Sequence, residues 1–128
     1  MTYHELPGLE AALRVESWGY RPIWHSEVVH ARWFTDDPQT AVVWFELAQH
    51  PGDLVLHGCA VPKLGRRALT REALDAIRCV ARGLGGVRLF APVPSWPAAD
   101  SRVLLRYLRL HGFAPSDSPL GLCLDLGG

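Results

Sequence analysis

Two side chains of the kinds that move protons lie inside predicted β-strands. Glu46 belongs to the run AVVWFELA over residues 41–48, and His57 belongs to LVLHGCAV over residues 54–61. Burial can raise the pKa of a strand carboxylate, and imidazole titrates near neutral pH, so each is a candidate general base. Alternation along the strands does not settle whether the two side chains share a face. The structural alternatives are a solvent-facing Glu46 and a hydrogen-bonded, non-catalytic His57.

A short basic loop follows the second of these strands. The segment PKLGRRA over residues 62–68 holds Lys63, Arg66 and Arg67 around Gly65, and it precedes a predicted helix. Backbone N–H groups and the dipole at a helix N-terminus attract anions, so the loop is a candidate anion site. The alternative is an ordinary connection with solvated arginines.

Charge is unevenly distributed along a chain whose net charge is zero. Residues 1–62 carry three basic side chains against eight acidic ones, whereas residues 63–128 carry ten against five. The basic half is suited to an anionic ligand. Its arginines follow helical spacing and balance acids, so we expect no nucleic-acid partner.

Several classes of protein are excluded by what the sequence lacks. The three cysteines are odd in number and form no CxxC pair, which favours a reducing, cytoplasmic setting without disulfides. The histidines show no metal-ligand spacing with cysteine or carboxylates. No apolar run is long enough to span a membrane, and no signal peptide is expected. Trp96, in a Pro-rich loop, is a candidate contact to a partner.

The pattern of apolar residues predicts one domain over residues 1–128, of mixed α/β class. Three β-branched and aromatic runs joined by short turns predict an antiparallel meander. A β-α-β unit follows, and such a unit implies a parallel strand pair. The predicted strands are 2–6, 28–35, 41–48, 54–61, 87–93 and 120–126. The predicted helices are 8–17, 70–83 with Thr70 as N-cap, and one from Ser101 to Gly112; residues 20–27 are either a turn or a short helix.

This order, β-α-(α)-β-β-β-α-β-α-β, resembles the GNAT (GCN5-related N-acetyltransferase) superfamily. The resemblance is best over residues 28–126, in two strand–loop–helix pieces, the second ending in Gly112-Phe113. It implies a central mixed, mostly antiparallel sheet with helices on both faces. It also implies acetyl-CoA as acyl donor, with a fourth strand that bulges, at Gly58 here, and splays from the fifth. The implied cofactor-binding residues are Gly58, Cys59, Val61, Lys63, Gly65, Arg66, Arg67 and Ala68.

The chain departs from the family pattern at two places. The family loop reads Gln/Arg-x-x-Gly-x-Gly/Ala, whereas an alignment on Gly65 puts Pro62 and Arg67 at the flanking positions. The tyrosine that often acts as general acid lies four residues before the Gly-Phe glycine, which is Leu108 here. Tyr107 is one residue away, or about 100° around the helix, and is the candidate acid.

The resemblance implies two functions of different classes. The first is N-acyl transfer from acyl-CoA to a small-molecule or protein amine, by direct attack in a ternary complex. The second is a catalytically silent GNAT-fold protein, such as an internal or head-associated bacteriophage virion protein, with a protein partner or a homo-oligomer in place of a substrate. An open gap between the fourth and fifth strands favours the first function, and a gap filled by side chains favours the second.

Overall fold

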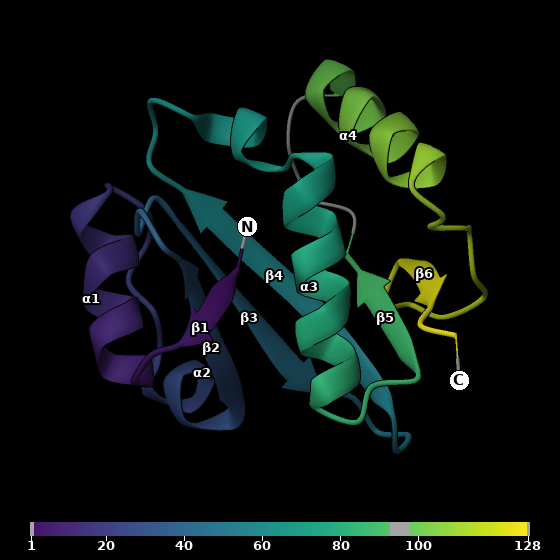
Figure 1. The fold of residues 1–128 in the computed structure, drawn as a ribbon, viewed down its shortest axis with the longest axis horizontal. Coiled ribbons are helices and arrows are strands. Elements are labelled where there is room, and N and C mark those ends of the chain that lie inside the picture. Colours follow the sequence, from purple (N-terminus) through teal and green to yellow (C-terminus); the bar gives the residue numbers. More distant parts are fainter. Residues whose placement is uncertain (1, 93–97, 128) are drawn as a thin grey trace.

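The computed structural model describes residues 2–92 and 98–127, with the side chains of 65, 66 and 98–101 left aside (Figure 1). The strands are β1 (Tyr3–Glu5), β2 (Ala31–Asp36), β3 (Ala41–Leu47), β4 (Asp53–Ala60), β5 (Arg88–Ala91) and β6 (Leu122–Asp125). The helices are α1 (Gly8–Ser17), α2 (His25–His30), the 3-10 helix η1 (Gly65–Ala68), α3 (Arg71–Gly83) and α4 (Ala98–Leu110). None of the helices described here is long and apolar enough to cross a membrane.

The six strands form a single sheet in the order β1-β2-β3-β4-β5-β6. Strands β1 to β4 pair antiparallel, β4 and β5 pair parallel across the α3 crossover, and β5 and β6 pair antiparallel. The predicted meander and β-α-β unit are therefore confirmed, and so is the mixed, mostly antiparallel sheet. Short turns join β2 to β3 and β3 to β4, whereas the parallel pair of β4 and β5 needs a helix-length connection.

Alternation along the strands divides the core into two clusters. On one face, Phe34 and Phe45 pack with Ile77 of α3 and with α4 side chains. On the other face, Trp33 and Val42 pack with α1. Figure 1 shows α3 lying across the sheet with α4 beside it and α1 at the β1 side. The two faces differ because successive strand side chains point in opposite directions.

The predicted strand over residues 28–35 begins later than expected. Residues 28–30 belong to α2, and β2 starts at Ala31. Packing explains the error, because a side chain on Gly8 would place its Cβ 2.8 Å from the Val28 carbonyl oxygen. The close approach of α1 to Val28 outweighs the β-propensity of the valines there.

The last expected helix, from Ser101 to Gly112, also differs from the structure. Helix α4 begins at Ala98, before the predicted cap at Ser101. Trp96, the candidate partner contact, lies outside the described residues. The last turn of α4 and the following Gly112, with φ of 99°, end the helix as expected.

Thr70 is the N-cap of α3, as predicted, and its Oγ1 accepts a hydrogen bond of 3.1 Å from the Ala73 N–H. We expect Thr70→Ala to lower the free energy of unfolding by about 1 kcal/mol in urea denaturation, because one N–H at the helix end loses its acceptor. Thr70→Ser keeps the oxygen and should remain near wild type. Equal losses in both variants would show that the methyl group, and not the cap, matters.

Candidate functional site

Glu46 and His57 lie side by side on one face of the sheet. The β3–β4 register places Trp44 opposite His57, and Glu46 follows Trp44 by two residues on the same face. His57 Nε2 lies 2.9 Å from Glu46 Oε1. The two atoms are at ion-pair distance but without the alignment of a hydrogen bond. The structure thus brings together the two candidate bases whose relative orientation the sequence left open.

The pair is buried on one side and open on the other. The Nε2 atom of His57 is itself buried, whereas the side chains of His57 and Glu46 remain 31% and 43% exposed. A partly open imidazole beside a carboxylate can take a proton from an incoming molecule, and the carboxylate compensates the positive charge that the ring gains. This arrangement is suited to general base chemistry.

Aromatic rings extend the site across the sheet. The Trp33 and Trp44 rings stack with centroids 4.5 Å apart and an interplanar angle of 20°. Trp44 and His57 stack at 5.5 Å and 16°. The three residues are direct cross-strand neighbours on β2, β3 and β4. Only the strand register reveals that Trp44 contacts a candidate base.

Strand β4 separates from β5 next to His57. The parallel pairing runs from Asp53↔Arg88 to Val55↔Phe90 and then ends, although β4 continues to Ala60. Within the described residues, the β5-facing edge of residues 56–60 therefore has no strand partner. This is the splayed arrangement that the family resemblance implied.

The expected bulge at Gly58 is wrong, because β3 and β4 pair without interruption from Ala41↔Ala60 to Leu47↔Leu54. A Cβ on Gly58 would lie 3.3 Å from Val43 Cγ1. The glycine therefore serves a close packing contact with β3.

The connection between α1 and α2 is held against the end of β4. The Tyr20 hydroxyl donates a hydrogen bond of 2.7 Å to the Ala60 carbonyl, and the Ile23 N–H donates one of 3.0 Å to Glu16 Oε1. Nearby, burial raises the pKa of the Cys59 thiol to about 12. Sequence reasoning missed Tyr20, because no local spacing links it to a residue so distant in the chain.

The basic loop folds into a tight turn between β4 and α3. Arg67 Nη2 donates a hydrogen bond of 2.8 Å to the Lys63 carbonyl, and the Arg67 N–H donates one of 3.0 Å to the Leu64 carbonyl. Lys63 is exposed, and Gly65 and Ala68 bound the 3-10 helix η1, which the sequence did not predict. The side chain of Arg66 lies outside the described residues. The loop thus stands at the end of β4 that leaves β5, beside the N-terminus of α3.

Tyr107 lies apart from the Glu46–His57 pair. It packs with the α3 and α4 side chains on the opposite face of the sheet, with its ring 4.5 Å from that of His111. Burial, followed by the nearby charge of Glu72, raises the pKa of Tyr107. Leu108, at the family's acid position, is 5% exposed and belongs to the core. The structure does not bring the candidate acid to the candidate bases.

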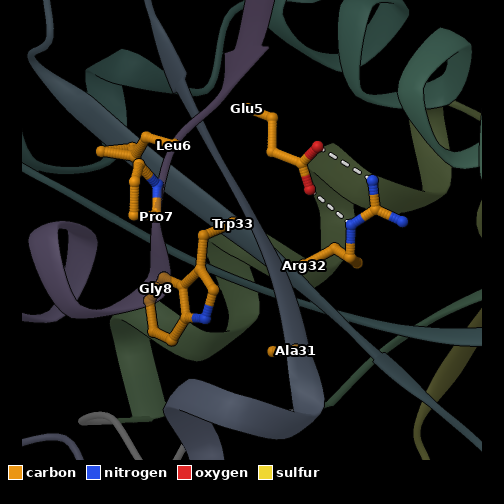
Figure 2. Close-up of a pocket in the computed structure, with 7 residues that line it drawn as sticks. All are labelled: Glu5, Leu6, Pro7, Gly8, Ala31, Arg32 and Trp33. Carbon is orange, nitrogen blue, oxygen red and sulfur yellow. Dashed lines mark hydrogen bonds and ion pairs between the residues drawn. The ribbon is translucent and has the colours of Figure 1, made fainter.

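Two hollows lie elsewhere on the surface. One, of about 410 Å³, lies where β1 ends, and Figure 2 shows the Glu5–Arg32 ion pair and Trp33 among its lining residues. The other, of about 480 Å³, lies along α4 beside Arg106 and Leu110. Neither is lined by Glu46 or His57, although the first reaches Trp33 at the end of the aromatic stack.

Solved N-acetyltransferase structures share this fold. Ribosomal-protein-S18-alanine N-acetyltransferase from Escherichia coli matches with a TM-score of 0.65 and 17% identity, over 99% of this chain and 94% of that one. The GNAT domain of S. lividans PAT matches with a TM-score of 0.66 and 14% identity, over 96% and 89%. A spermidine N-acetyltransferase chimera from Vibrio cholerae and hSSAT matches with a TM-score of 0.69 and 9% identity, over 98% and 97%. No protein-family model and no curated protein matches the sequence.

The environments of the cysteines predict an order of thiol reactivity. Cys79 is exposed, whereas burial raises the pKa of Cys59 to about 12. Because the thiolate is the reactive form, we expect iodoacetamide at pH 8 to alkylate Cys79 at least about tenfold faster than Cys59, measured by peptide mass spectrometry. In urea the difference should disappear. Equal rates in the folded protein would contradict the described packing of Cys59.

Proposed function

Because the chain has the fold of GNAT N-acetyltransferases, we propose that it transfers an acetyl or other acyl group from acyl-CoA to an amine. The observation that carries this proposal is the Glu46–His57 pair, which lies on β3 and β4 next to the point where β4 leaves β5. A base is therefore available beside an unpaired strand edge. The substrate class is a small-molecule or protein amine.

His57 would act as the general base. An amine arrives protonated at neutral pH and must lose a proton before its nitrogen can attack a carbonyl. His57 takes that proton, and Glu46, 2.9 Å from Nε2, compensates the charge on the imidazolium. The new C–N bond then forms as the C–S bond breaks, and the nitrogen gives up its second proton to solvent. Tyr107 lies on the opposite face, so we do not assign it as the general acid. The leaving thiolate takes its proton from solvent.

Acyl-CoA would supply an activated thioester. The residues that would hold it match its parts: backbone groups for the pantetheine amides, and cations for the phosphates. At the open edge of β4 the backbone of Gly58 would meet the amides of the pantetheine arm, and Cys59 and Val61 would flank it; the Val61 N–H itself donates to the Thr40 carbonyl on the β3 side. Lys63, Gly65, Arg66, Arg67 and Ala68, with the N-terminus of α3, form the positive and N–H-rich end for the phosphates.

Acetyl-CoA binding by calorimetry tests the cofactor site. We expect the Lys63→Ala/Arg67→Ala variant to bind at least about tenfold more weakly than wild type, because two cations near the phosphates are lost. Arg21→Ala/Arg109→Ala is the matched control, since it removes two exposed charges from other elements. No binding by wild type at millimolar acetyl-CoA would contradict acyl transfer and leave the fold as a scaffold for protein contacts.

Steady-state thiol release tests the assigned base. With acetyl-CoA and a panel of amines that includes spermidine and a peptide with an N-terminal alanine, we expect His57→Gln to lower kcat/KM about 100-fold. Glu46→Gln should lower it by about tenfold, because the imidazolium loses its counter-charge. Tyr107→Phe should remain within about twofold of wild type, since Tyr107 lies on the other face. A larger loss in Tyr107→Phe than in His57→Gln would contradict the assignment of His57 as the general base.

A further inference from the structure

We propose that Trp44 is a positioning residue that sets the orientation of the His57 imidazole toward Glu46. This inference rests on the proposed function of His57 as general base. It starts from two contacts of the ring: the Trp44 indole lies against its face, and Glu46 Oε1 lies at its Nε2 edge. The first contact fixes the plane of the ring, and the second fixes which edge of the ring meets the carboxylate.

His57 needs such a support because of its place on β4. It lies two residues beyond Val55, the last β4 residue paired with β5. In the described structure this part of β4 has no partner on its β5 side. Its side chain is also partly exposed. An exposed imidazole at an open edge has freedom to change rotamer, and every rotamer that leaves Glu46 lowers the fraction of productive base.

The other face of the Trp44 ring is also supported. Its ring stacks on Trp33, which is 1% exposed and whose Nε1 donates a hydrogen bond of 3.3 Å to the Val28 carbonyl. The antiparallel register places the three rings directly opposite one another across β2, β3 and β4. Side chains in directly opposed positions stay in contact because the backbone hydrogen bonds fix their separation. The orientation of His57 is therefore coupled to the buried core.

The stack also suits the charge that His57 gains. The face of an indole ring carries negative electrostatic potential and attracts a cation above it. An imidazolium that lies against Trp44, with Glu46 at its edge, meets negative potential from both directions. Trp44 thus assists the base in both geometry and charge.

A double-mutant cycle on the acyl-transfer reaction tests this role. We expect Trp44→Leu to lower kcat about tenfold while KM for acetyl-CoA stays within about twofold, and Trp44→Phe to retain most activity because it keeps a ring against His57. In the His57→Gln background, Trp44→Leu should change kcat by less than about twofold. A full tenfold loss in that background would show a general structural effect and overturn the proposal.

Nuclear magnetic resonance of His57 separates this inference from the proposed function. In wild type and Trp44→Phe we expect nuclear Overhauser contacts between the His57 ring and the Glu46 side chain, and we expect Trp44→Leu to lose them. Contacts that persist in Trp44→Leu overturn the positioning role whatever the activity. Contacts that disappear in a protein with no transferase activity uphold the positioning and contradict acyl transfer. If Trp44→Leu does not fold, Trp44→Val offers a β-branched residue suited to the strand.

Discussion

The unbroken antiparallel ladder between β3 and β4 is the constraint on which the candidate site depends. From Ala41↔Ala60 to Leu47↔Leu54 the two strands keep one register, so each side chain on β4 has a fixed neighbour on β3. This register brings His57 beside Trp44 and within 2.9 Å of Glu46. A shift of β4 by one residue would move His57 to the opposite face, where α3 packs, and separate it from Trp44 and Glu46. The buried faces on both sides of the sheet make such a shift unfavourable.

The short pairing between β4 and β5 leaves an open strand edge beside the candidate site. Because the two strands pair only as far as Val55↔Phe90, β4 carries His57 and the following residues along an edge that has no β5 neighbour in the described residues. The parallel arrangement also sends the chain from the end of β4 directly into the basic loop and α3. The chain order therefore brings three features close together: a candidate base, an open strand edge and the N-terminus of α3.

The departures from the family pattern have a consistent structural explanation. Leu108 fills the position where a tyrosine acid is usual and is buried with the α3 side chains, while Tyr107 turns toward Glu72 and His111. Gly58 packs against Val43 in a regular ladder, without a bulge. The chain thus keeps the architecture of the fold, and its two candidate bases lie together on the β3–β4 face. On that face the rings of Trp33 and Trp44 stack in line with His57.

The sequence by itself determined the order of the elements, the meander, the β-α-β unit and the cap at Thr70, because these depend on local periodicity, turn residues and side-chain acceptors. It also singled out Glu46 and His57 by their chemical type. Only the tertiary structure decided that these two share a face, that Tyr107 lies on the other one, and that Tyr20 reaches Ala60. It also decided that residues 28–30 are helical, through the packing of Val28 against Gly8. These outcomes depend on register and on contacts between distant segments, which the local preferences of a strand or helix do not encode.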